Sequence, residues 1–115
     1  MNAWQDSTRE DYLSKGLASR SGSGRKPALL IIDFSNGFTD PKSPLGGNFD
    51  QQLATTASLL TEFRRGRLPV VYTTVAYQSD YRDAGVFIKK VPSLSILVGG
   101  SDLVEIDNRI APQEG

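Results

Sequence analysis

Asp33 follows directly on an apolar run, Ala28 to Ile32, and is the first residue in the chain whose position suggests chemistry. A continuous apolar run bounded by Pro27 and Gly37 is typical of a strand buried on both faces of a parallel sheet. In open α/β sheets, ligands bind at the carboxyl ends of the strands. Asp33 is therefore a candidate acid–base residue; the alternative is a strand-end acid that caps the following turn.

The sequence contains no cysteine and no histidine. These 115 residues therefore lack a thiolate nucleophile, the commonest general base and the commonest metal ligand. Asp33, Asp40 and Asp50 do not have the spacing of a calcium loop. Gly22-Ser-Gly24 precedes the apolar run instead of following it, which argues against a phosphate loop. We predict no metal site and no cofactor.

Composition excludes several classes of partner. Lys plus Arg and Asp plus Glu each number 13, so the chain lacks the basic excess of a nucleic-acid surface. No apolar run approaches the roughly 20 residues of a membrane span. Residues 1–6 have neither the basic nor the apolar region of a signal peptide. We expect no nucleic acid, no membrane contact and, by default, a cytoplasmic location.

The chain divides into a lead-in and linker, residues 1–26, and one α/β segment, residues 27–115. Acidic residues and good helix formers predict a short helix over Thr8–Lys15. Residues 19–26 are rich in Gly and Ser, a composition typical of a flexible connector. Regular structure with a core is therefore expected after residue 26.

The α/β segment begins with the pattern of a βαβ unit. Strands are predicted over Ala28–Asp33 and Pro69–Val75, the second strongly β-branched. Residues 36–48 hold too many Gly and Pro residues for a regular element, and long loops are often functional. A helix with Asp50 as its cap should run to Gly66. Its apolar stripe comprises Leu53, Ala57, Leu60 and Phe63, widened by Leu59.

The secondary-structure signal weakens beyond Ala76, and the sequence does not decide whether a third strand follows. One clear helix cannot cover both faces of a parallel sheet. We infer that the sequence is the N-terminal part of a larger α/β domain. The alternative is that other copies cover the faces, which predicts a homo-oligomer.

Several segments, in order, resemble the isochorismatase-like cysteine hydrolases, especially the branch containing N-carbamoylsarcosine amidases and maleamate amidohydrolases. The similarity spans nearly all of residues 22–115. It is carried by Arg25–Asp33, Asn36, Phe38, Asp40-Pro41, Pro44-Leu45, Gly85–Pro92, Gly100–Asp107 and Ile110–Pro112. The resemblance implies a parallel-sheet, three-layer α/β sandwich, of which this chain would be the N-terminal part.

The resemblance also implies a triad of Asp, Lys and Cys that hydrolyses an amide. Asp33 matches the family's Asp, whereas the Cys has no counterpart in this sequence. The register of the later segments implies that the Lys lies beyond residue 115. Lys90 is then a substrate-binding or structural residue and Lys89 is exposed; the alternative is that one of them is the triad Lys.

Two further residues match the family's first motif. Phe38 is a candidate wall of the substrate pocket, and Asn36 is a candidate substrate-binding residue, with a structural role in the loop as the alternative. Tyr77, Tyr81 and Arg82 follow the second strand and would share the edge of Asp33 if the strands are parallel; they line the pocket or are ordinary surface.

The resemblance implies hydrolysis of a linear amide or carbamoyl group of a small substrate, with release of ammonia. Such a reaction would need the missing Lys and Cys, so this chain alone should be inactive. Two alternatives stay open: a non-catalytic α/β module that associates with itself or a partner, and an isochorismatase-type hydrolase that needs no thiol.

Overall fold

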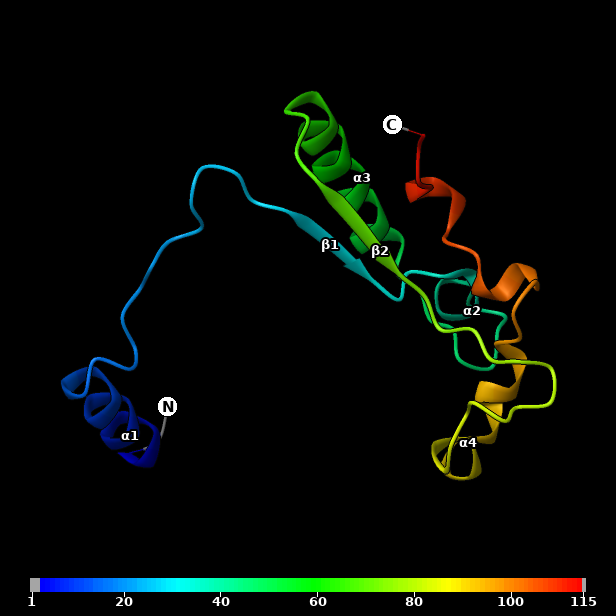
Figure 1. Cartoon of the computed structure of the whole chain (residues 1–115), viewed down its shortest axis with the longest axis horizontal. Coiled ribbons are helices and arrows are strands. Elements are labelled where there is room, and N and C mark those ends of the chain that lie inside the picture. The colour runs from blue at the N-terminus through cyan, green and yellow to red at the C-terminus, as the bar shows by residue number, and fades with distance from the viewer. Residues whose placement is uncertain (1–2, 115) are drawn as a thin grey trace.

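The computed structural model describes residues 3–114 of the chain (Figure 1). Its helices and strands are α1 (Ala3–Ser14), β1 (Leu29–Ile32), α2 (Asn36–Thr39), α3 (Asp50–Arg65), β2 (Val70–Thr73) and α4 (Phe87–Lys90). Three short 3-10 helices follow: η1 (Pro92–Ile96), η2 (Asp102–Val104) and η3 (Asn108–Ile110). In Figure 1, an extended segment separates α1 from the part that carries both strands.

The two strands form a parallel sheet, as the βαβ pattern predicts. Leu29 pairs with Val70, and the register continues to Ile32 opposite Thr73. Parallel strands place their carboxyl ends at the same edge. The residues that follow the strands, Asp33 and Thr74, therefore start from that shared edge. The fold is α/β with a small two-stranded parallel sheet.

Helix α3 covers one face of this sheet and forms the first core. Leu53 and Leu60 are buried on α3 and pack with Ile31 from β1 and Ile110 from η3. These residues confirm the predicted apolar stripe at its centre, whereas Leu59 is exposed. The helix thus holds β1 in place from one side.

The other face of the sheet is open, so β1 is not buried on both faces as its apolar run predicts, in line with the expectation that one helix cannot cover both. Leu30 and Ile32 on β1 are 54% and 60% exposed, and Val71 on β2 is 49% exposed. The apolar run reflects a strand suited to burial on two sides, but the described chain provides a helix for only one of them.

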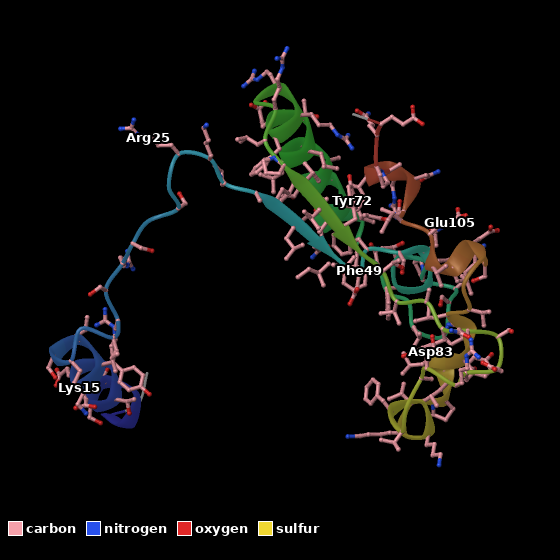
Figure 2. All side chains as sticks on the ribbon, viewed as in Figure 1. Lys15, Arg25, Phe49, Tyr72, Asp83 and Glu105 are labelled. Atoms are coloured by element: carbon pink, nitrogen blue, oxygen red, sulfur yellow. The ribbon has the colours of Figure 1, made fainter. Side chains whose placement is uncertain are left out.

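The start of α3 also differs from expectation. Asp50 is the first helical residue, and Phe49 occupies the cap position without a side-chain hydrogen bond. The Asn48 side chain instead accepts a hydrogen bond from the Asp50 N–H at 3.0 Å. Phe49 packs toward the first core, with its ring centre 6.2 Å from that of Phe34 (Figure 2). An Asx-type contact from Asn48, two residues before Asp50, therefore replaces the predicted Asp cap.

Residues 76–110 form turns in place of a third strand. Ser93–Val98 lies largely in η1, and this segment pairs only through an isolated parallel bridge between Val98 and Tyr77 within the described residues. This region has its own core of buried residues, Leu94, Leu97 and Val104. The buried side chains of this core come from residues 94–104, which lie close together in the sequence, so short turns suffice to bring them into contact.

Two more predictions of local structure are wrong. The loop after β1 contains a single helical turn, α2, although residues 36–48 were expected to hold no regular element. Gly37 lies within this turn and packs closely against Leu97 and Leu103, where a side chain would clash. The lead-in helix begins at Ala3, not at Thr8, and ends before Gly16, which has a positive φ of 72°.

Candidate active site

Asp33 lies at the carboxyl end of β1, where the sequence predicts it. Its N–H donates to Thr73, reaching the carbonyl oxygen and the hydroxyl oxygen at 3.2 Å each. The Thr73 hydroxyl in turn donates to Asp33 Oδ1 at 3.0 Å. Within residues 3–114, no donor contacts the second carboxylate oxygen. Asp33 is partly buried, and its second oxygen therefore keeps its full capacity to accept a hydrogen bond from outside the described residues.

The backbone of Asp33 is strained. Its φ is 60°, in the left-handed region that residues other than Gly rarely adopt. Asp tolerates this region better than most residues, because its short polar side chain can hydrogen-bond nearby. Strained residues gather at functional sites, where the surrounding structure holds them in place. Asp33 therefore combines an unusual backbone conformation with a position directly after β1.

The chain that follows Asp33 is anchored by the segment before η3. Asn36 N–H donates to the Glu105 carbonyl, and Asp107 N–H donates to the Phe34 carbonyl, each at 2.9 Å. An antiparallel bridge between Ser35 and Ile106 lies between these two bonds. Both sides of Asp33 are therefore fixed, by β2 before it and by residues 105–107 after it.

Among residues 3–114, no hydrogen bond links Asn36 to the Asp33 carboxylate, and Phe38 belongs to a different cluster. The Asn36 side chain donates to the Asp102 carbonyl at 2.8 Å, the structural alternative considered for it. Phe38 packs against the second core, the cluster of Leu94, Leu97 and Val104. Their contacts within the described residues are with the protein itself, and their role toward a substrate remains a prediction.

Lys90 ends α4 and is exposed, as is Lys89. Figure 1 shows α4 well separated from the carboxyl end of β1. Among residues 3–114, neither lysine makes an ion pair. In this arrangement the structure does not bring a lysine of α4 to Asp33.

The residues after β2 are engaged in their own loop. Tyr77 pairs through its backbone with Leu97 and Gly99. The Tyr81 hydroxyl donates to the Ser95 carbonyl at 2.8 Å. Arg82 is exposed and lies 4.0 Å from Asp80. These contacts order the loop between β2 and η1 without involving Asp33.

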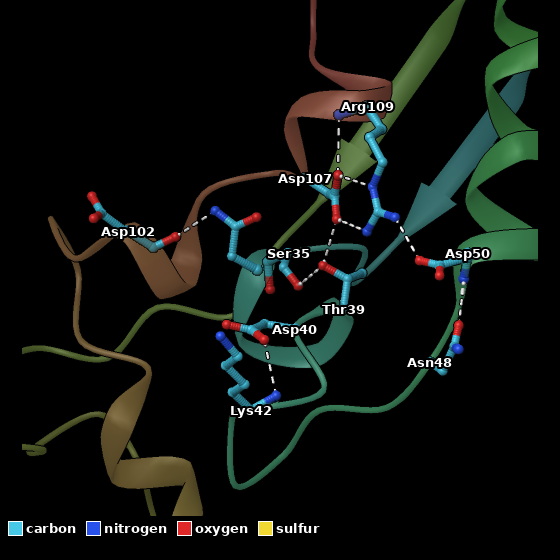
Figure 3. A network of polar contacts seen from close by, with 10 residues as sticks. Ser35, Thr39, Asp40, Lys42, Asn48, Asp50, Asp102, Asp107 and Arg109 are labelled. Carbon is cyan, nitrogen blue, oxygen red and sulfur yellow. Dashed lines mark hydrogen bonds and ion pairs between the residues drawn. The ribbon is translucent and has the colours of Figure 1, made fainter.

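A second carboxylate, Asp107, stands at the centre of a network that the sequence analysis did not single out (Figure 3). Asp107 is almost fully buried, at 4% exposure. Thr39 donates to Oδ2 at 2.7 Å, and Arg109 donates from its backbone N–H, Nε and Nη2 at 2.7 to 3.0 Å. Arg109 Nη1 also reaches Asp50 Oδ1 at 2.7 Å.

These contacts set the charge of the pair. The hydrogen bonds from Arg109 hold the pKa of Asp107 well below its usual value, against the opposing effect of burial, and Thr39 adds to the lowering. The same hydrogen bond to Asp107 raises the pKa of the Arg109 guanidinium. Asp107 is thus an ionised structural residue that ties α2, η3 and the start of α3 together.

The features that sequence reasoning missed had weak signals. Thr73 reads as an ordinary β-branched strand residue, and its contact with Asp33 follows from the strand register alone. The Asp107 side chain accepts from the Arg109 N–H, a contact that Asp commonly makes in turns, but no local pattern points to its other partner, Thr39. No group of three or more metal-binding side chains occurs in the described part of the chain. Across those residues, no helix is long and apolar enough to span a membrane.

Comparison with known proteins gives the family. Residues 27–115 match the isochorismatase domain family. The chain is 38% identical to a maleamate amidohydrolase of Pseudomonas putida over 112 residues, and 32% identical to an N-carbamoylsarcosine amidase of an Arthrobacter species over 110 residues. These alignments cover 95% and 90% of this chain, but only 52% and 41% of the relatives. The chain therefore spans about half the length of the curated relatives it matches.

The fold agrees with this assignment. A solved cysteine hydrolase of Pseudomonas syringae superposes with a TM-score of 0.66 at 23% identity, covering 75% of this chain and 41% of that one. At this identity the likeness supports the fold. With the match over residues 27–115, it shows that the chain belongs to the isochorismatase family.

Proposed function

We propose that this chain is the Asp-bearing portion of a cysteine amidohydrolase. The complete enzyme would hydrolyse a linear amide or carbamoyl group of a small substrate and release ammonia. Asp33 would be its proton acceptor, and the Lys and Cys would come from polypeptide outside residues 1–115. The observation that carries the proposal is Asp33 itself. Its backbone has a positive φ directly after β1, and one of its carboxylate oxygens has no donor among the described residues.

The chemistry needs more than this carboxylate. An amide is cleaved by a nucleophile that attacks its carbonyl carbon, and a thiol must first lose its proton. A carboxylate within hydrogen-bond reach can accept that proton and later protonate the leaving nitrogen. The C–N bond then breaks, ammonia leaves, and water hydrolyses the resulting thioester. With no cysteine in the sequence, the acyl-forming step is unavailable to this chain alone.

The names of the relatives support the substrate class. One is a maleamate amidohydrolase and the other an N-carbamoylsarcosine amidase, and both names describe hydrolysis of the C–N bond of an amide or carbamoyl group. The complete domain would be a three-layer α/β sandwich, with further polypeptide over the open sheet face. Action on a small soluble molecule in the cytoplasm is part of the same proposal.

The test compares the purified 115-residue chain with the protein encoded by the same reading frame continued past Gly115. Ammonia release is measured with maleamate and N-carbamoylsarcosine as probes. We expect none from the chain and turnover from a longer protein, abolished by iodoacetamide. Turnover by the chain itself would overturn the cysteine mechanism. Ammonia release that iodoacetamide does not abolish would also contradict the cysteine mechanism, whereas isochorismatase-type hydrolysis cleaves an ether and would release no ammonia from these probes.

A second candidate is a non-catalytic module that self-associates. It is favoured by the open sheet face, where Leu30, Ile32 and Val71 are about half exposed. Exposed apolar patches on folded proteins commonly mark interaction sites. A stop codon directly after Gly115, together with a homo-oligomer that Ile32→Ser dissociates, would support this candidate over the enzyme.

A further inference from the structure

We propose that Thr73 is the positioning residue for the Asp33 carboxylate. This inference rests on the proposed function, in which Asp33 accepts a proton. The Thr73 hydroxyl contacts Asp33 twice, donating to Oδ1 at 3.0 Å and accepting from the N–H at 3.2 Å. One side chain therefore holds both the strained backbone and the carboxylate of Asp33.

The strand register makes this contact specific. Thr73 is the last residue of β2 and lies opposite Ile32, the last residue of β1. Its carbonyl accepts from the Asp33 N–H, which closes the sheet at this edge. The hydroxyl has a single proton, and that proton is given to Oδ1. With Oδ1 occupied, the rotamer of Asp33 is set and Oδ2 is the oxygen left to receive a proton.

The next residue provides a matched control. Thr74 has the same side chain, but its hydroxyl donates to the Val104 carbonyl at 2.6 Å, away from Asp33. Successive residues of an extended segment point to opposite sides, so the two hydroxyls serve different parts of the fold. Removing the Thr74 hydroxyl deletes one hydrogen bond and removing the Thr73 hydroxyl deletes two, yet only the Thr73 hydroxyl contacts Asp33 among the described residues.

The first measurement uses the chain as it exists. Three-bond couplings to Asp33 Cγ, measured by NMR, report whether its side chain holds one rotamer or averages over several. We expect single-rotamer couplings in the wild type, Thr73→Ser and Thr74→Val, and averaged couplings in Thr73→Val. Valine keeps the shape and β-branching of threonine, so a loss of strand packing does not explain such a pattern.

The second measurement uses the longer protein of the same reading frame, if it turns over. Loss of one hydrogen bond to a charged group should lower kcat about tenfold in Thr73→Val with KM unchanged. Thr73→Ser should restore kcat, and Thr74→Val should keep it. Single-rotamer couplings in Thr73→Val, or equal impairment of Thr73→Ser and Thr73→Val, would overturn the inference. Full activity of Asp33→Asn would instead overturn the proposed function, whatever Thr73 does.

Discussion

Asp33 and Asp107 are carboxylates in the same small domain with opposite surroundings. Asp107 is buried, and donors from Thr39 and Arg109 occupy both of its oxygens. Asp33 is partly buried and receives one donor, the Thr73 hydroxyl, within the described residues. A carboxylate saturated by fixed donors is held ionised and stabilises the fold, whereas one with an open oxygen can exchange a proton. The number of donors around each Asp therefore separates structure from chemistry.

The contrast predicts that substitution of Asp107 lowers folding stability, whereas substitution of Asp33 leaves it nearly unchanged. Replacing Asp107 with Ala removes a charged acceptor from Thr39 and Arg109 and should cost about 2 kcal/mol of unfolding free energy. Asp33→Asn keeps the size and the tolerance for positive φ, so its stability should stay within about 0.5 kcal/mol of wild type. Urea unfolding followed by circular dichroism measures both. Equal losses in the two variants would mean that both carboxylates are structural.

The pH dependence of stability sharpens the same contrast. The folded-state pKa of Asp107 lies below its ordinary value of 3.8, so the unfolded chain takes up the proton first as pH falls. The stabilisation is fully present above that value and is lost as pH falls toward the folded-state pKa. Between about pH 6 and about pH 2.5, the free energy of unfolding should therefore fall more steeply with decreasing pH for wild type than for Asp107→Asn. Parallel curves would contradict the ionised state of Asp107.

The smallest expected effect lies at the outer end of the network. Asp50 is 71% exposed and meets Arg109, itself 45% exposed. Exposed ion pairs are screened by solvent, so Asp50→Asn should shift the melting temperature by less than about 2 °C. Thermal melts in low and high salt measure this shift. A loss as large as that of Asp107→Ala would show that the ion pair, and not the buried carboxylate, carries the network.

Local sequence signals predicted the elements that arrange Asp33. The apolar run of β1, the stripe on α3 and the β-branched β2 each have a strong period or propensity, and all three are present. The position of Asp33 follows from them. Sequence also indicated that one helix would leave a sheet face without cover, and Leu30 and Ile32 are exposed there.

Features that depend on long-range pairing were not predictable. Thr39 and Asp107 are 68 residues apart, and no local pattern links them. Thr73 acquires its partner only when the register of the sheet is known. The turns of residues 76–110 are too short for periodicity to show, so an apolar segment there resembled a strand. In each case tertiary contacts override or add to weak local preference.

The role proposed for Asp33 is that of proton acceptor in a cysteine amidohydrolase. Its most direct test is ammonia release by the longer protein of the same reading frame, comparing Asp33→Asn with Asp107→Asn at a temperature where both are folded. A role for Asp33 as proton acceptor predicts that Asp33→Asn lowers kcat by about a hundredfold or more, while Asp107→Asn stays within a few fold of wild type. Wild-type turnover by Asp33→Asn would contradict it.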